Sequence, residues 1–525
     1  MGSATGWGHG YYTSVPYTTG FFRETAPNWL DFAALISGQA PPRQQEGDAF
    51  QYLDLGCGMG FGLCLMAALY PEGQFVGVDF NPDHIGHASS LAEALQLTNI
   101  RFLEADFLSL PQKPALLGIE DNGRGAYDYV VAHGIATWVA PAVREALLSI
   151  GAACLAVRGL LYVSYNCLPG WLPLTTYQQL VKLELRRHVG VPSAELFRQC
   201  AERLQNLVGN NEQTTPLSRM VPSLRQELID LPSRNINYLY GEYGHEQWQP
   251  LYVGDLHQQA LDLRLTPVAT ATLPELFDDL LAPSLQEAVL GEREPLLRQT
   301  LIDLATFKGF RRDIFVRGSV RLSPEQRRTR LEAVPLRLQE APPLTAYEFS
   351  TSFGLVRGEP DVYRGVEAAM ANGGRRFGQL MVACDQPLPE LERIVALLLH
   401  EGRLALDRGE AGDAARAGCD QVNGQLLARI REGWSYNRLA AASIGSAVEL
   451  NLIEAEVVAN LGRRPADAAW AAQLQARLER IGVALTSEDD KSPVELLGIA
   501  QEFQQRRLAW WERLGFAFPE ALSLQ

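Results

Sequence analysis

A short apolar run that passes through closely spaced glycines into a longer apolar run constrains the fold more than any other feature. Residues 50–55 predict a strand, the sequence Gly-Cys-Gly-Met-Gly occupies residues 56–60, and residues 61–70 predict a helix. Glycines at such a turn permit positive φ and let a ligand approach the backbone without a Cβ in the way. The helix behind them offers free N–H groups. The order of these segments predicts a ligand-binding loop at the end of a strand.

Short and longer apolar runs continue to alternate after this loop, which predicts an α/β fold with a doubly wound, Rossmann-like sheet. Further strands are expected at residues 74–78, 100–104, 127–132 and 159–165, and helices at 82–96 and 141–156. The 525-residue chain is too long for one hydrophobic core, since domains usually have about 100–200 residues. Two to four domains are therefore expected.

Acidic residues stand where the second and third strands end. Asp79 follows the glycine loop by about twenty residues, at a place where a carboxylate can accept both hydroxyls of a ribose. Asp106 follows the third strand, and Phe107 next to it suits the face of an adenine. A single aspartate is more often a helix cap, and dinucleotide-binding folds also use a GxG loop. The three features in register, without GxGxxG, favour S-adenosylmethionine (SAM) over NAD.

The cofactor site predicted from these positions collects residues from the ends of the first four strands. It comprises Asp54, Gly56, Cys57, Gly58, Gly60, Asp79, Phe80, Asp106, Phe107 and His133. SAM carries an activated methyl group, so in-line positioning and electrostatics supply most of the rate, and S-adenosylhomocysteine is the product. The seven cysteines are scattered without a CxxC pair, and no metal is expected.

The glycine loop, LDLGCGMG, resembles the SAM-binding loop of class I methyltransferases. The chain also resembles bacterial methyltransferases that carry a methyltransferase regulatory domain, including protein-lysine methyltransferases of rickettsiae that act on outer-membrane proteins. The stretches that carry this resemblance are YYTSVPYTTGFF at residues 11–22, HGIATWV at 133–139, LYVSYNCLPGW at 161–171 and NYLYGEY at 237–243. The resemblance covers residues 10–320 and implies methylation of an amine, with protein lysine as the favoured acceptor.

An acceptor site is expected beyond the ends of the fourth and fifth strands, where ligands of open α/β sheets bind. Tyr165 and Asn166 offer a hydroxyl and an amide that can orient an amine. Trp138 could wall the pocket, and His133 either acts there or only makes a structural hydrogen bond. An aromatic N-terminal stretch is interpreted as a packed arm or as a lid that contacts the substrate through Tyr17. The predicted catalytic set is Tyr165, Asn166, His133, Trp138 and Tyr17.

The acceptor and the partners are less constrained. The net charge of −15 argues against nucleic acid, and a basic run at residues 311–321 is interpreted as a solvated face. No apolar run is long enough to span a membrane and no secretory signal is evident, so a cytoplasmic protein is expected, with a homodimer as one option. A small-molecule or glycan acceptor in a biosynthetic pathway, and a non-catalytic SAM-binding scaffold, remain alternatives.

The remaining two-thirds of the chain is predicted to be mostly helical. Residues 175–207 predict a helix broken near 190–192, and residues 210–310 further helices broken at prolines, including Pro267. Residues 312–321 and 333–338 are expected to be the last two strands of the main sheet. The domains are assigned as residues 1–185 (SAM-binding core with the arm), 186–340 (helical regulatory insert) and 341–525 (helical, with part of a winged-helix pattern used for interaction).

Overall fold

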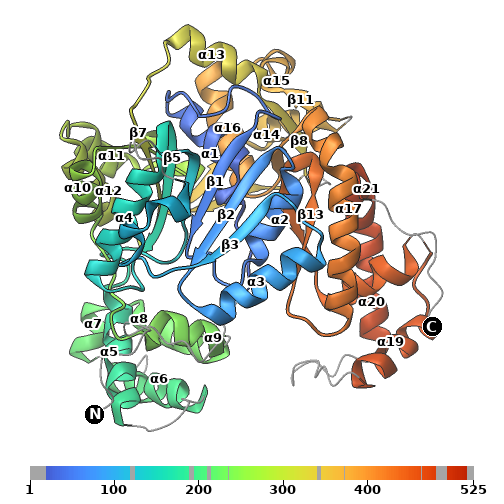
Figure 1. Cartoon of the computed structure of the whole chain (residues 1–525), viewed down its shortest axis with the longest axis horizontal. Coiled ribbons are helices and arrows are strands. Elements are labelled where there is room, and N and C mark those ends of the chain that lie inside the picture. The colour runs from blue at the N-terminus through green and yellow to red at the C-terminus, as the bar shows by residue number, and fades with distance from the viewer. Residues whose placement is uncertain are drawn as a thin grey trace.

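A seven-stranded sheet forms the centre of the molecule, in the order β3-β2-β1-β4-β5-β7-β6 (Figure 1). The computed structural model describes residues 19–118, 125–187, 194–209, 215–234, 236–339, 344–371, 373–462, 464–480 and 493–516. The strands are β1 (Phe50–Leu55), β2 (Gly73–Asp79), β3 (Ile100–Glu104), β4 (Tyr127–Ala132), β5 (Leu155–Asn166), β6 (Leu265–Thr270) and β7 (Phe310–Arg317). Strand β7 is antiparallel to both of its neighbours, and the other pairs are parallel. The predicted Rossmann-like α/β class is confirmed.

Helices cover both faces of this sheet because its strands are apolar on both sides. In β1, the Tyr52 side chain joins the core on one face, whereas Leu53 and Leu55 join the core on the other. The first face is covered by α1 (Pro27–Ile36), α2 (Phe61–Leu69) and α3 (Pro82–Ala94), and the second by α4 (Pro141–Cys154) and α10 (Val253–Asp262). The alternation of apolar runs in the sequence reflects these two buried faces.

A group of helices between β5 and β6 has a hydrophobic core of its own. These helices lie together beneath the sheet in Figure 1. They are α5 (Leu172–Arg187), α6 (Ala194–Val208), α7 (Pro216–Met220), α8 (Leu224–Asp230) and α9 (Ile236–Leu239), followed by a π-helical turn at Tyr240–Gly244. The turn closes back onto the end of β5, so this insert borders the carboxyl edge of the sheet.

The last strands of the sheet differ in part from the prediction. Strand β7 confirms the first of the two predicted strands, since it pairs with β5 over residues 160–166. The second prediction is wrong, because β8 (Pro335–Leu338) lies in a separate sheet between β11 and β12. The seventh strand is β6, where Pro267 was interpreted as a break. Strand β6 is at the sheet edge, where a proline costs no ladder hydrogen bond to a further strand.

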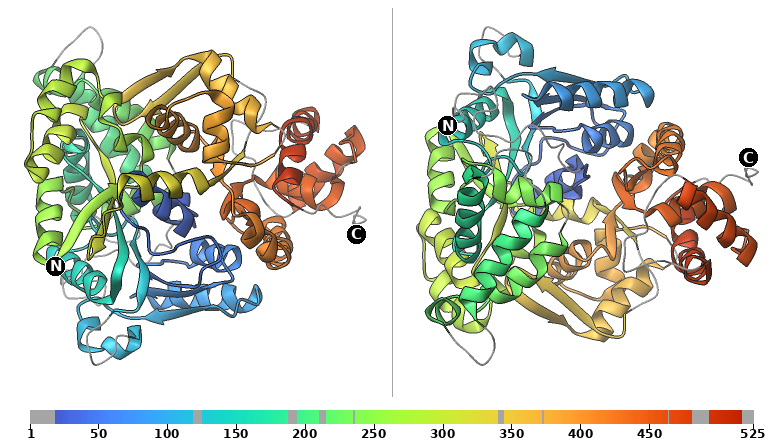
Figure 2. Two further views of the ribbon diagram at one scale, coloured as in Figure 1. Left: turned by 90° about the horizontal axis from the view of Figure 1, so that it is seen from above. Right: turned by 90° about the horizontal axis from the view of Figure 1, so that it is seen from below.

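The chain after β7 packs on the α1–α2 face and shares its core. Two helices before β7, α11 (Pro283–Leu290) and α12 (Pro295–Thr306), instead contribute to a small core of their own, and α12 packs against α10. After β7 come α13 (Pro324–Ala333), β8, β9 (Tyr347–Thr351), β10 (Gly354–Gly358), α14 (Pro360–Met370), β11 (Arg375–Arg376), α15 (Phe377–Cys384), α16 (Leu388–His400), β12 (Leu404–Leu406), α17 (Gly409–Arg431), β13 (Arg438–Ala441), β14 (Ser446–Glu449), α18 (Leu452–Glu456), α19 (Ala468–Arg480), α20 (Pro493–Phe503) and α21 (Ala509–Arg513). Figure 2 shows the last helices, in red, on the side away from the green insert.

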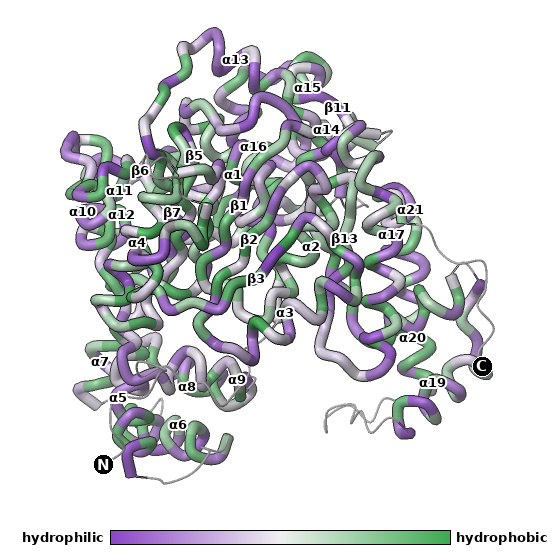
Figure 3. The backbone as a smooth tube through the Cα atoms, in the orientation of Figure 1, coloured by the Kyte–Doolittle hydropathy of each residue, from purple (hydrophilic) through white to green (hydrophobic). Residues whose placement is uncertain are grey.

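The hydropathy of the chain follows this layout. Hydrophobic stretches gather around the central sheet, whereas outer helices such as α13 carry hydrophilic stretches (Figure 3). Helix α16 is buried along most of its length, from Leu391 to Leu399, so the winged-helix-like segment does not present this helix to a nucleic acid. The β13–β14 hairpin lies within residues 341–525, which the sequence predicted to be mostly helical.

The basic run at residues 311–321 is a solvated face only at its end, around the exposed Arg321. Arg311 is buried and pairs with Asp303 and Asp313, with N–O distances of 2.6 and 3.0 Å. Arg317 donates to the carbonyl oxygens of Ala152 in α4 and of Leu155 just after it. Arg321 donates to the Ser37 carbonyl. Arg311 and Arg317 stabilise β7, because this strand places their guanidinium groups against acidic side chains and the end of α4, whereas Arg321 follows the strand.

Candidate functional site

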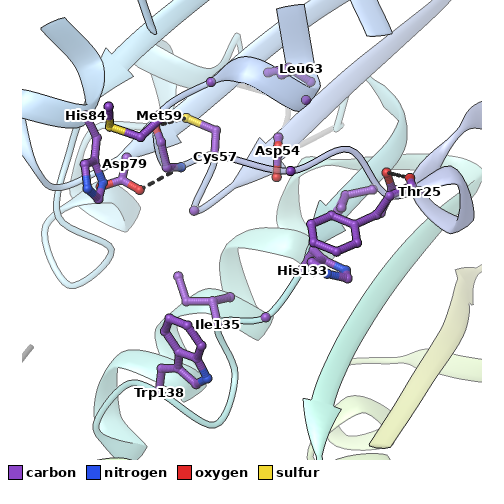
Figure 4. Close-up of a pocket in the computed structure, with 18 of the residues that line it drawn as sticks. Thr25, Asp54, Cys57, Met59, Leu63, Asp79, His84, His133, Ile135 and Trp138 are labelled. Carbon is purple, nitrogen blue, oxygen red and sulfur yellow. Dashed lines mark hydrogen bonds and ion pairs between the residues drawn. The ribbon is translucent and has the colours of Figure 1, made fainter. Parts of the chain in front are cut away.

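A cavity of about 290 Å³ lies at the carboxyl ends of β1, β2 and β4, at the lower end of the size range of small-molecule sites. Figure 4 shows part of its lining, with the glycine loop, Asp79 and His84 on one side and Ile135 and Trp138 on another. Each of the ten cofactor residues predicted from the sequence lines it. So do Tyr165, Asn166, His133 and Trp138 of the predicted catalytic set, whereas Tyr17 lies outside the described residues.

The glycine loop is held open by its backbone conformation. Gly56, Gly58 and Gly60 have φ values of +86°, +53° and +72°, a region that side chains with a Cβ rarely adopt. The Gly56 and Cys57 N–H groups both donate to the Val78 carbonyl, at 2.7 and 3.1 Å, and so tie the loop to β2. A Cβ on Gly58 would meet no atom within 4 Å, because it would project into the cavity.

Asp79 links this loop to the end of β2. One of its carboxylate oxygens accepts a hydrogen bond from the Gly58 N–H at 3.0 Å, and the other accepts from the Asn81 N–H at 2.9 Å. The Nδ1 atom of His84 lies 3.3 Å from the second oxygen. A carboxylate oxygen can accept more than one hydrogen bond, so this buried group keeps acceptor capacity for the two hydroxyls of a ribose.

Two further aspartates complete the cofactor end. Asp106 accepts a hydrogen bond from the Leu108 N–H at 2.9 Å, which fixes the turn after β3, and Phe107 next to it is buried. Asp54 at the end of β1 is half-buried, and burial together with the charge of Asp79 raises its pKa to about 7. Carboxylates around a glycine-lined opening suit a cationic nucleoside, so the residues present fit SAM. SAM, when bound, supplies the electrophilic methyl group.

His133 sits where the cofactor end meets the rest of the cavity. Its Nδ1 is 2.9 Å from the Tyr162 hydroxyl and 3.2 Å from the Ser164 hydroxyl, and the Phe22 ring lies over its ring at 3.8 Å. Burial and the nearby charge of Arg312 lower the pKa of His133 to about 3. The imidazole is therefore neutral at physiological pH and too weak a base to take a proton from an ammonium group.

Tyr165 and Asn166 use their polar groups differently. The Tyr165 hydroxyl donates to Asp313 at 2.6 Å, in a buried network that also contains Arg311 and His257. The Asn166 amide donates to a carboxylate oxygen of Glu242 at 2.9 Å, and Glu242 itself lines the cavity. The sequence predicts that both residues orient the acceptor, but in the structure the tyrosine hydroxyl donates to Asp313 of β7.

Residues 46–191 match the family described as a methyltransferase domain, and residues 235–317 match a predicted methyltransferase regulatory domain. The uncharacterized protein sll1526 of Synechocystis sp. is 30% identical over 71% of this chain and 71% of its own length. The uncharacterized protein RP789 of Rickettsia prowazekii is 24% identical over 61% of this chain and 55% of its own length.

The chain belongs to the SAM-dependent class I methyltransferases that carry a regulatory domain. Its fold is similar to that of PKMT2 from Rickettsia typhi, with a TM-score of 0.65 and 16% identity, covering 95% of this chain and 99% of that one. The structure of PKMT2 in complex with AdoHcy is similar to the same degree, with a TM-score of 0.65 and 17% identity over 94% of this chain. The two matched segments meet in the cavity, since Asn166 belongs to the first and Glu242 to the second.

The N-terminal arm of the methyltransferase borders the cavity through its described residues. Thr19, Gly20, Phe21, Phe22 and Thr25 line the opening between the glycine loop and His133. The Gly20 carbonyl oxygen packs so closely on α2 that a Cβ at Gly62 would lie 2.6 Å from it. This close packing agrees with the interpretation of the stretch as an arm packed on the core.

Sequence reasoning missed several residues of the site. His84 and Thr25 line the cofactor end, and Glu242 and Phe310 line the far end. Glu242 lies within the NYLYGEY stretch that carries the family resemblance, which was a usable signal, but nothing in the sequence indicates where that stretch folds. Within the described ranges, no group of three or more His, Cys, Asp or Glu side chains is placed to hold a metal ion.

Proposed function

We propose that this methyltransferase transfers the methyl group to an amine, and that the amine is a lysine side chain of a protein. The observation that carries the proposal is the charge of the cavity lining. Among the described residues, four carboxyl groups line it, and no lysine or arginine does. The carboxyl groups are Asp54, Asp79, Asp106 and Glu242. Such a lining favours cations and disfavours phosphates and carboxylates as acceptors.

The aromatic walls support the same chemistry. Trp138 is buried beside His245, with ring centroids 5.4 Å apart, and Phe310 of β7 also lines the cavity. Aromatic faces hold the alkyl stem and the charge of a lysine by apolar and cation–π contacts. Trp171, in contrast, packs against Trp248 and Tyr243 and so anchors the insert to the sheet. Trp138 and Asn166 are therefore the proposed acceptor contacts, with Tyr165 as a positioning residue.

The fold likeness to PKMT2 from Rickettsia typhi extends over 95% of this chain, and the sequence resemblance to rickettsial protein-lysine methyltransferases supports a protein acceptor. The domains after β7 also share a core with the α1–α2 face, so the molecule offers a surface far larger than a small acceptor needs. Among the described residues, no helix is long and apolar enough to cross a membrane.

Radiolabelled SAM tests the proposal directly. We expect that incubating the enzyme with macromolecular and small-molecule fractions of its host's extract labels the macromolecular fraction, and that hydrolysis of this fraction yields labelled methyl-lysine. A heat-inactivated enzyme serves as the control. Label confined to the small-molecule fraction would instead establish a biosynthetic methyltransferase, and the absence of any label with intact SAM binding would favour a non-catalytic protein.

A further inference from the structure

Glu242 is a carboxyl group from the regulatory domain that reaches a cavity built by the catalytic domain. It lies in the π-helical turn Tyr240–Gly244, a rare form of backbone that occurs frequently at functional sites. Only 7% of the residue is exposed, and it lines the cavity beside Asn166 and Phe310. Because Glu242 is bound by Asn166 at the end of β5, which is separated from β2 by β1 and β4, it lies away from Asp79, at the end of the cavity where the acceptor is proposed to bind.

The surroundings of Glu242 leave its charge poorly compensated. Asn166 donates one hydrogen bond to it, the Trp248 side chain is a second donor that lowers its pKa, and Arg234 is the cation that acts on it from the insert. The titratable groups that face it from the same insert are Tyr238 and Tyr243, and His245 beside it is neutral because burial lowers its pKa to about 3. Desolvation dominates, and the pKa of Glu242 is raised to about 7.

The charged form of Glu242 is disfavoured by burial, whereas an amine acceptor is almost entirely in its charged form in water. A lysine ammonium has a pKa of about 10.4, so only about one molecule in a thousand is neutral at pH 7.4. The methyl group can be attacked only by the nitrogen lone pair of the neutral amine. A buried carboxylate at the acceptor end meets both needs, since it attracts the ammonium and can accept its proton.

We propose that Glu242 is the residue that binds the acceptor ammonium and takes its proton. One N–H bond of the ammonium breaks and one O–H bond forms on the Glu242 carboxylate, which leaves a neutral amine and a neutral carboxyl group. The lone pair then forms the N–C bond as the sulfonium C–S bond breaks, so the positive charge passes from sulfur to the methylated nitrogen. The proton leaves Glu242 for solvent when the product departs. The assignment rests on the proposed amine acceptor and deepens it.

The proton transfer is favoured because it removes two opposite charges from a desolvated site. A paired ammonium and carboxylate are expensive to desolvate, whereas the neutral amine and neutral acid are not. The arrangement also explains why a regulatory domain belongs to the site. The turn that carries Glu242 must dock on β5 through Asn166 before the cavity has its base, so the catalytic domain alone is incomplete.

Glu242→Gln keeps the shape and the hydrogen-bonding capacity of the side chain but removes the base. We expect kcat/KM to fall by about 10²- to 10³-fold, with the affinity for S-adenosylhomocysteine within about twofold of that of the wild-type enzyme, by calorimetry. Glu246→Gln is the matched control, because Glu246 follows the same turn and pairs with Arg186 at the surface. A kcat/KM equal to that of the control would overturn the assignment.

A pH titration gives a readout that does not depend on turnover. In difference infrared spectra between wild type and Glu242→Gln, we expect a protonated-carboxyl band that disappears as the pH rises through about 7. The kcat/KM of the wild type should rise over the same interval, because the carboxylate is the active form, and this inflection should be missing in the variant. The absence of a carboxyl group that titrates near pH 7 would contradict the proposal.

Asn166→Ala provides a second variant that leaves the base in place. The Asn166 amide of the wild type stabilises the ionised form of Glu242. Its loss should therefore raise the pKa of Glu242 further and shift the inflection in kcat/KM to higher pH. A purely structural role of Glu242 would lower the rate without moving the inflection. If the wild type labels only small molecules, the lysine proposal fails, while the same variants, assayed on that fraction, still decide the role of Glu242.

Discussion

Replacing Asp79 with alanine should weaken the binding of S-adenosylhomocysteine by roughly a hundredfold or more, as measured by calorimetry. The carboxylate is the proposed acceptor for both ribose hydroxyls, and two charge-assisted hydrogen bonds together contribute about 3 kcal/mol or more. The loss should be aggravated by the glycine loop, because Asp79 also accepts the Gly58 N–H at 3.0 Å. Two effects therefore act in the same direction.

The matched control is Asp83→Ala, four residues further along the chain. Asp83 is exposed in the first turn of α3 and does not line the cavity, so its loss should leave the affinity within about twofold. Melting curves of both variants verify that the fold is retained. An unchanged affinity in a folded Asp79→Ala protein would place the ribose elsewhere.

The cofactor end could be predicted from the sequence because it depends on local structure. Its residues lie at the end of a strand or in the loop that follows, and the carboxyl ends of parallel strands must meet at one edge of the sheet. A sequence that puts Asp79 and Asp106 at the ends of successive strands therefore predicts that both line the same cavity. In the structure both of them do. The glycine spacing predicts a loop with positive φ values at the glycines, and the loop adopts these values.

The acceptor end could not be predicted in the same way, since it depends on where distant segments dock. Asn166 and Glu242 are separated by the whole helical insert, and the π-helical turn that presents Glu242 has no recognisable sequence pattern. Asp313 likewise reaches Tyr165 only because β7 pairs with β5. These contacts follow from tertiary packing, which overrides local periodicity.

Strand β6, at the edge of the sheet, shows a second reason why the sequence did not predict the whole fold. Pro267 is a strong breaker in a helix and in a central strand, but β6 lies at the edge and tolerates it next to a local irregularity in its pairing with β7. The short strand β8 has the same alternating pattern as a core strand, yet it pairs with β12 instead. Alternation identifies a strand and does not identify its partner.

Arg408→Ala should cause the largest loss of stability among the variants considered. Its guanidinium is buried, donates to Glu46 and Glu72, and lies 4.1 Å over the Tyr70 ring. Removing one partner of a buried ion-pair network typically costs about 3–5 kcal/mol. We expect the first thermal transition to fall by roughly 5–10 °C. Arg416→Ala, in the helix α17 that Arg408 directly precedes but exposed and paired with Asp413, should change this transition little.

The Arg408→Ala substitution should also weaken cofactor binding. Arg408 fixes the segment after β12 on α2, and further along it the Tyr436 ring stacks on Phe61 at 4.7 Å. The Tyr436 hydroxyl is 2.9 Å from His87, whose other ring nitrogen is 2.8 Å from the Met59 carbonyl in the glycine loop. Loosening this docking should therefore weaken S-adenosylhomocysteine binding in Arg408→Ala but not in Arg416→Ala. Equal melting temperatures and affinities in the two variants would mean that the C-terminal domains do not support the cofactor loop.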